Sequence, residues 1–206
     1  MAHLVCFIDD SDFEHDLVLH EIAPRATGLE FCQTHTFEEA RETLGNRFPA
    51  LFLLDLWGQD ETVLDPHITP EQDLRKRIEQ FPTIREVYEG LDQLEGDTHN
   101  EYLKRLFTIV NCWRTLFEEV CDAVGQNRKY GLSNLAEARK HYSGVPGVFY
   151  TRKSLISDAV AMFKARADGL FIKPTGQNEE ETRRLTRDYA PTLQSELLRI
   201  IQSVHA

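Results

Sequence analysis

Short apolar runs alternate with amphipathic stretches in the first third of the chain. The first run is His3–Ile8, an amphipathic stretch follows at 12–22, and a second short run covers Leu29–Cys32. Residues 50–54 (ALFLL) are apolar at every position, which is typical of a central parallel strand covered by helices on both faces. The pattern predicts strands that alternate with helices.

The C-terminal part of the chain shows the same alternation. Two apolar runs, Gly147–Tyr150 and Gly169–Ile172, predict the fourth and fifth strands. Between them a helix is expected over 153–167, with an inward face of Leu155, Ile156, Ala159 and Phe163. A last helix is expected to begin at Pro191, because proline is tolerated at a first helical position; its apolar stripe is Leu193, Leu197, Ile200, Ile201 and Val204. The alternation predicts an α/β fold with a flavodoxin-like, doubly wound five-stranded parallel sheet.

The middle of the chain interrupts this alternation. A strand–helix–strand unit takes about 30 residues, whereas Asp55 and Thr151 are 96 positions apart. Apolar residues at alternating spacings of three and four form a coiled-coil-like seam: Leu103, Leu106, Val110, Trp113, Phe117, Val120 and Val124. Two shorter apolar segments, 74–81 and 84–94, offer a helical partner. We expect an α/β domain of residues 1–58 and 145–206, with an α-helical hairpin or small bundle inserted at 59–144.

Charge and composition restrict the partners of the protein. The formal net charge of −11 argues against a nucleic-acid-binding surface, which requires clustered Lys and Arg. No apolar run reaches the roughly 18 residues of a membrane span, and the N-terminus lacks a signal-peptide pattern. The four cysteines form no CxxC pair and suit reduced, buried thiols. We expect a cytoplasmic protein with no nucleic-acid and no membrane partner.

The residues that directly follow the predicted strands form the candidate site. In an open parallel sheet, ligands bind at the carboxyl ends of the strands. These ends carry three carboxylates, a hydroxyl and an ammonium group: Asp9 and Asp10 after the first strand, Asp55 after the third, Thr151 after the fourth and Lys173 after the fifth. Carboxylates packed together repel one another unless a cation neutralises them, and hard oxygen ligands suit Mg²⁺. The sequence therefore predicts an acidic edge that binds Mg²⁺.

The segments around these residues resemble the receiver domains of two-component response regulators, the CheY-like family. The matching segments are 7–10 (FIDD), 53–56 (LLDL), 149–151 (FYT) and 171–174 (FIKP). Each is weak alone, but all appear in the family's order and strand contexts. The resemblance covers the two outer parts of the chain and not the middle. It implies an atypical receiver domain with a long helical insertion between the third and fourth strands.

The resemblance implies a phosphoacceptor site. Asp55 would be the nucleophile that forms an aspartyl phosphate. Thr151 would bind the phosphoryl group, and Lys173 would stabilise its charge. The peptide bond between Lys173 and Pro174 is expected to be cis, as in the family.

The resemblance also implies a set of Mg²⁺ ligands. Asp10 would bind the metal directly and Asp9 through water. Asp55 and the backbone carbonyl of Trp57 would complete the protein's share of the coordination.

Three positions depart from the family pattern. Arg152 stands where a small residue usually follows the threonine, and its guanidinium would either obstruct small phosphodonors or add a phosphate contact. Leu170 stands where an aromatic switch residue is usual, and period-two alternation directs Phe171 to the opposite face. The usual Met-Pro turn after the acceptor is missing, and Trp57 stands there instead; it would either cap the site or, as we favour, pack on the inserted helices.

The expected function is two-component signal transduction. A histidine kinase or phosphotransfer protein would supply the phosphoryl group, and an unknown output protein would bind the helical insertion. The domain would catalyse only its own phosphoryl transfer and dephosphorylation, so it is not expected to be an enzyme in the usual sense. The heptad seam could close within the insertion or form a homodimer, and the sequence leaves both open.

Two other functions compete with this expectation. The first is a pseudo-receiver that works without phosphorylation, as a protein-interaction module that acts through its helical insertion. The second is a phosphatase of the haloacid dehalogenase type, suggested by Asp10-Ser11-Asp12 after a strand. The phosphatase is disfavoured because Lys173 ends the last strand, whereas that family needs a later acidic metal-binding motif.

Overall fold

A computed structural model of the chain describes residues 2–59, 63–152 and 156–204. The chain folds as two units: an α/β unit of residues 1–60 and 127–206, and a helical unit of Glu61–Gln126. The chain thus returns to the α/β unit at residue 127, earlier than the predicted boundary at 144. The reason is the helix α6 (Lys129–His141), which packs on the central sheet.

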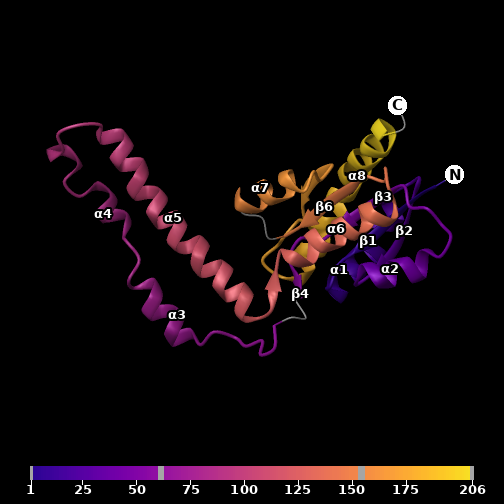
Figure 1. Ribbon diagram of the computed structural model, residues 1–206, viewed down its shortest axis with the longest axis horizontal. Helices are drawn as coiled ribbons and strands as arrows, with labels where there is room; N and C mark the ends of the chain where they lie inside the picture. Colours follow the sequence, from indigo (N-terminus) through magenta and orange to yellow (C-terminus); the bar gives the residue numbers. More distant parts are fainter. Residues whose placement is uncertain (1, 60–62, 153–155, 205–206) are drawn as a thin grey trace. The chain divides into compact units, whose positions relative to one another are not determined.

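A five-stranded parallel sheet forms the centre of the α/β unit (Figure 1). Its strands are β1 (His3–Ile8), β2 (Leu29–Thr34), β3 (Leu51–Leu54), β6 (Gly147–Thr151) and β7 (Gly169–Ile172). They lie in the order β2-β1-β3-β6-β7, and every neighbouring pair is parallel. This confirms the flavodoxin-like, doubly wound sheet. Two further short strands, β4 (Gly58–Gln59) and β5 (Gln126–Asn127), form a separate two-stranded sheet.

Helices cover both faces of the central sheet. One face packs on α1 (Asp12–Leu17), the π-helix Val18–Ile22, the 3₁₀ turn Ala23–Arg25 and α8 (Glu179–Val204). The other face packs on α2 (Phe37–Leu44) and α6, where the Phe52 and Tyr142 rings lie 5.3 Å apart. Because both faces are covered, β3 is apolar and buried at every position, as expected for a central parallel strand.

The last helix begins earlier than predicted. It starts at Glu179, so Pro191 lies inside the helix and not at its first position. The charge-rich stretch before Pro191 continues the helix, and the proline removes only one backbone hydrogen bond from it. The predicted apolar stripe is confirmed where its side chains are described: Leu193, Leu197, Ile200 and Ile201 are buried. The Val204 side chain lies outside the described part of the chain.

Helix α7 (Ile156–Lys164) turns a different face inward from the predicted one. Phe163 is 84% exposed and Ala159 is exposed, whereas Asp158 and Met162 are buried. The predicted Leu155 and the Ile156 side chain lie outside the described residues. The physical reason is that Asp158 accepts hydrogen bonds from two buried or half-buried side chains of the α/β unit, which fixes the rotation of the helix.

The helical unit contains α3 (Glu71–Ile78), α4 (Ile84–Tyr88), the 3₁₀ turn Leu91–Gln93 and the long helix α5 (Thr98–Ala123). The shorter segments pack on α5: the rings of Phe81 and Trp113 meet edge to face at 5.3 Å. Arg105 of α5 donates to the carbonyls of Glu86 and Glu89 at 3.2 and 2.6 Å. This confirms the extra helical region. Among the described helices, none combines the length and the apolar character that crossing a membrane would need.

Candidate functional site

The sheet register brings the carboxyl ends of β1 and β3 together. Ile8 of β1 lies opposite Leu54 of β3, so the residues that follow them, Asp9 and Asp55, leave the sheet side by side. The Asp55 amide donates to the Ile8 carbonyl at 2.9 Å, which extends the pairing to the strand ends. Two apolar strands thus deliver two carboxylates to one place.

Asp9, Asp10 and Asp55 form one acidic cluster. One oxygen of each carboxylate lies within 4.8 Å of the others. Asp9 and Asp55 are buried, whereas Asp10 is half-buried and its Oδ2 accepts the Gln59 amide at 2.8 Å. Burial raises the pKa of Asp9 to about 7, against the opposing effect of Lys173. Burial also raises the pKa of Asp10, so the cluster favours a neutralising cation.

Lys173 supplies a positive charge to this cluster. Its buried Nζ lies 2.5 Å from Oδ2 of Asp9 and 2.9 Å from Oδ1 of Asp55. Burial alone would lower the pKa of Lys173, but the carboxylates of Asp55, Asp9 and Glu14 outweigh burial and raise this pKa. The ammonium group therefore stays charged and bridges two of the predicted metal ligands.

The donor set fits a hard divalent cation. Ligands on opposite sides of Mg²⁺ lie about 4 Å apart, close to the 4.8 Å that encloses the three carboxylate oxygens. Carboxylate oxygens are also the donor type that Mg²⁺ prefers. Trp57 follows Asp55 by two positions, and its carbonyl stays a predicted ligand.

Thr151 and Lys173 end neighbouring strands, as predicted. The Lys173 amide donates to the Thr151 carbonyl at 3.0 Å, and Thr151 is buried. The predicted cis bond between Lys173 and Pro174 is wrong, because every peptide bond of the described residues is trans. The Pro174 carbonyl instead accepts a hydrogen bond from Arg152 at 2.5 Å, and the lysine reaches both carboxylates with the trans bond.

Arg152 neither blocks the acidic cluster nor reaches into it. Its Nε donates to Oε1 of Glu14 at 2.6 Å. Its Nη1 donates to the Pro174 carbonyl and, at 2.9 Å, to the Thr175 hydroxyl. The guanidinium is therefore held between α1 and the loop after β7.

Sequence reasoning missed two residues at this edge, Glu14 and Gly131. Glu14 is a buried carboxylate in the first turn of α1; acidic residues are common at that place in a helix, so its type alone did not mark it as part of the site. Gly131 of α6 lies against the segment that follows β3, where a Cβ would collide with the Asp55 carbonyl oxygen. Gly131 was missed because residues 59–144 were assigned to the insertion and no helix was predicted around this position.

Trp57 packs inside the α/β unit. It is buried, and its indole Nε1 donates to Oδ2 of Asp158 on α7 at 3.1 Å. The Arg128 guanidinium lies 5.6 Å from the centre of the indole ring and donates to Oδ1 of Asp158 at 2.9 Å. Both partners belong to the α/β unit, although Arg128 stands within the segment 59–144 that was predicted as the insertion. Packing of Trp57 on the inserted helices stays a prediction. The contacts connect the segment after Asp55 to α7.

The two positions before Ile172 alternate as predicted. Phe171 packs against the core that faces α8, whereas Leu170 is 37% exposed. No aromatic side chain therefore occupies the usual switch position.

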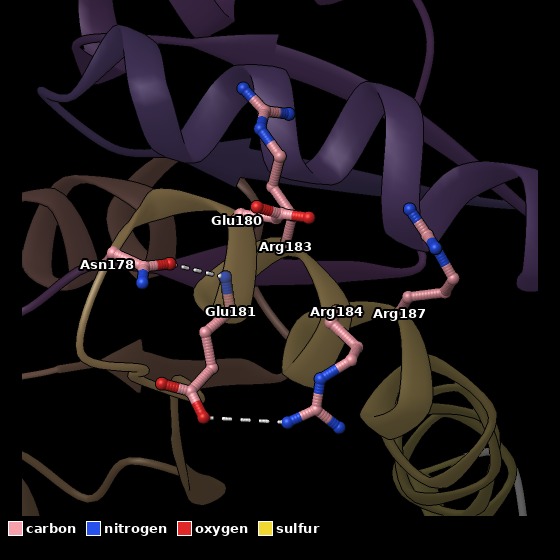
Figure 2. Close-up of a pocket in the computed structure, with 6 residues that line it drawn as sticks. All are labelled: Asn178, Glu180, Glu181, Arg183, Arg184 and Arg187. Carbon is pink, nitrogen blue, oxygen red and sulfur yellow. Dashed lines mark hydrogen bonds and ion pairs between the residues drawn. The ribbon is translucent and has the colours of Figure 1, made fainter.

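A hollow lies at the start of α8 (Figure 2). Its lining residues are Asn178, Glu180, Glu181, Arg183, Arg184 and Arg187. Each arginine faces a carboxylate: Arg183 pairs with Asp16 and Glu179, Arg184 with Glu181 and Asp188, and Arg187 with Glu21. Because these charges are already balanced, the hollow does not resemble an anion site.

Comparisons with known proteins support the fold. No protein-family model and no curated protein matches the sequence. The structure is similar to the response regulator domain of Thermotoga maritima CheB, with 12% identity, a TM-score of 0.50 and coverage of 98% of each chain. It is also similar to a CheY-like receiver domain protein from Methanospirillum hungatei, with 14% identity, a TM-score of 0.49 and coverage of 98% of this chain and 99% of that chain. At such identities the likeness shows the fold alone: this chain has the CheY-like receiver fold, with an extra helical region.

Proposed function

We propose that this chain is a two-component receiver that accepts a phosphoryl group on Asp55. The observation that carries the proposal is the cluster of Asp9, Asp10 and Asp55 within 4.8 Å, with the Lys173 ammonium between two of them. Buried carboxylates cost stability unless they are paired or functional. Two buried carboxylates and a half-buried one at one sheet edge, beside a threonine and a lysine, suit phosphoryl transfer better than a structural role.

The chemistry of the proposed reaction follows from these groups. A carboxylate oxygen of Asp55 attacks the phosphorus atom, and the bond between phosphorus and the leaving group of the donor breaks, with its electron pair going to the leaving group. Lys173 neutralises charge on the phosphoryl oxygens, and Thr151 donates a hydrogen bond to them. Asp9, Asp10, Asp55 and the Trp57 carbonyl would hold Mg²⁺, which supplies further charge neutralisation when bound.

The proposed partners follow from the same chemistry. The donor would be a histidine kinase or a phosphotransfer protein, because a phosphohistidine can pass its phosphoryl group to an aspartate. The output would pass through protein contacts of the helical unit.

The pseudo-receiver is the second candidate, and one observation favours it. Apolar side chains of α5 are about half exposed: Leu103 47%, Phe107 59%, Val110 51% and Trp113 49%. Such a face suits protein contacts whether or not Asp55 is phosphorylated. In this alternative the receiver fold would serve as a scaffold for the helical unit.

Intact mass spectrometry separates the two candidates. The protein is incubated with Mg²⁺ and acetyl phosphate or phosphoramidate, with Asp55→Ala as the control. A phosphoryl adduct that requires Mg²⁺ and is absent from the variant is the expected result. If no adduct forms, and beryllofluoride does not bind either, the proposed phosphoacceptor role is wrong and the pseudo-receiver is favoured.

A further inference from the structure

Glu14 is a fourth carboxylate at the edge of the acidic cluster. It lies on α1, its side chain is 8% exposed, and its Oε2 lies 3.7 Å from Nζ of Lys173. Lys173 therefore has three carboxylate partners, at 2.5 Å (Asp9), 2.9 Å (Asp55) and 3.7 Å (Glu14). Two of these are proposed metal ligands, and Glu14 is the one that is not.

Arg152 binds the other oxygen of the same carboxylate. Its Nε lies 2.6 Å from Oε1 of Glu14, and its guanidinium stacks 5.8 Å from the centre of the Phe13 ring. The hydrogen bonds to Pro174 and Thr175 fix the guanidinium to the loop that follows Lys173. The Glu14 carboxylate thus lies between two cations. Arg152 is held by three hydrogen bonds, whereas Lys173 also contacts the carboxylates of Asp9 and Asp55.

We propose that Glu14 is a positioning residue that gives the Lys173 ammonium a place outside the metal ligands, and that Arg152 sets how strongly Glu14 attracts it. When a divalent cation binds Asp9 and Asp55, the like charges of the cation and the ammonium repel. Glu14 then offers the ammonium a carboxylate that the metal does not need. Arg152 competes with Lys173 for Glu14 and weakens this attraction.

The inference rests on the proposed function, because it assigns a role to Lys173 in a Mg²⁺-binding site. It predicts effects of opposite sign for the two partners. Removing the charge of Glu14 leaves Lys173 on the metal ligands and should weaken Mg²⁺ binding. Removing Arg152 leaves Glu14 free to attract Lys173 and should strengthen Mg²⁺ binding. A merely structural ion pair would weaken binding in both cases, and a plain charge effect on the metal would leave the effect of Arg152→Ala unchanged in the Glu14→Gln variant.

The test is the dissociation constant of Mg²⁺, measured by isothermal titration calorimetry on the full chain. We expect Glu14→Gln to raise the constant about tenfold, a size typical of residues that support metal ligands. We expect Arg152→Ala to lower it about threefold, a modest change because Arg152 acts through Glu14 and is partly solvated. In the double variant the effect of Arg152→Ala should disappear, because Arg152 acts only through Glu14.

Glu21 and Arg187 provide matched controls. Their side chains form a second ion pair between a buried glutamate and an arginine, at 2.8 Å, and the Glu21 side chain is also 8% exposed. Glu21→Gln and Arg187→Ala should leave the Mg²⁺ constant unchanged. Glu14→Asp keeps the charge and should restore part of the affinity, and thermal melting shows whether each variant folds.

The outcomes separate this inference from the proposed function. Unchanged Mg²⁺ binding in Glu14→Gln and Arg152→Ala, or weaker binding in both, overturns the role of Glu14 even if Asp55 is phosphorylated. The opposite-sign pattern with neither an Asp55 adduct nor beryllofluoride binding supports the role of Glu14 and overturns the phosphoacceptor function. A wild-type chain that binds no Mg²⁺ overturns the inference itself, whatever the adduct experiment shows. If Glu14→Gln does not fold, Arg152→Ala still tests the inference, because unchanged or weaker Mg²⁺ binding in this variant overturns it.

Discussion

The α/β unit and the helical unit differ in how completely they bury their apolar side chains. In the α/β unit, Val5, Phe7, Phe52 and Leu53 are 0% exposed. In the helical unit, the four apolar residues of α5 named above are about half exposed. The α/β unit therefore has a closed core that can hold buried charges at fixed distances. The helical unit has a core of fewer buried residues and apolar side chains left in contact with solvent.

This difference suggests a division of labour between the units. Chemistry needs groups held within a fraction of an ångström, and rigid strand ends meet that need. Exposed apolar side chains on a helix suit recognition of another protein. The acceptor site would then lie in one unit and the recognition surface in the other.

The largest expected effect comes from a matched pair of phenylalanines. Phe52→Ala should lower the free energy of unfolding by about 4 kcal/mol, because it leaves a cavity in a closed core. Phe107→Ala should change it by no more than about 0.5 kcal/mol, because the side chain is 59% exposed and substitutions at exposed positions cost little. Urea unfolding followed by circular dichroism measures both values.

A similar loss of unfolding free energy in Phe52→Ala and Phe107→Ala would contradict the difference in burial between the two units. That result would mean that the exposed face of α5 is covered in solution. Repeating the Phe107→Ala measurement at several protein concentrations would then show whether a second copy of the chain covers it, because association makes stability depend on concentration.

The sequence predicted the α/β unit well because its signals are local. The apolar run at residues 50–54 predicts a central strand, and Asp55 directly after it marks the end of the strand that carries a candidate site residue. The boundaries of the insertion were harder, because α6 carries no feature that separates it from the helices before it. Its assignment depends on packing: Gly131 fits against Asp55 only because no Cβ intervenes.

The candidate site was predicted only in part for a similar reason. Asp9, Asp55 and Lys173 each follow a strand of one parallel sheet. The order of the strands therefore places them at one edge, independently of the contacts that their side chains make. The role of Glu14 depends on the rotation of α1 and on a partner 138 positions away, Arg152. The Lys173–Pro174 bond, which the resemblance predicts to be cis, is trans.

The next largest effect is expected at Lys173. Lys173→Met should lower the free energy of unfolding by about 3 kcal/mol, because it leaves two buried carboxylates without their cation. Added Mg²⁺ should restore part of that loss, since a cation bound by the same carboxylates stabilises the folded state. Chemical denaturation with and without Mg²⁺ provides the measurement.

Lys140→Met is the control for the Lys173 variant. The Lys140 side chain is 67% exposed and pairs with Glu137 on the surface of α6, so its loss should cost little. If the free energy of unfolding of Lys173→Met is the same with and without Mg²⁺, the acidic cluster does not hold the metal.

The smallest effect concerns the ion pair that connects the N-terminal helical segment to α8. The hydrogen bond from Arg187 holds the pKa of Glu21 below its usual value. A lowered folded-state pKa means that the pair stabilises the protein above the unfolded-state pKa, about 4.3, and that this stability is lost as the pH falls through the folded-state pKa. Glu21→Gln should therefore cost about 1 kcal/mol at pH 7 and progressively less below about pH 4. Urea unfolding of both proteins across this range measures the difference, and a gap that widened on acidification would show that the pair does not act by charge.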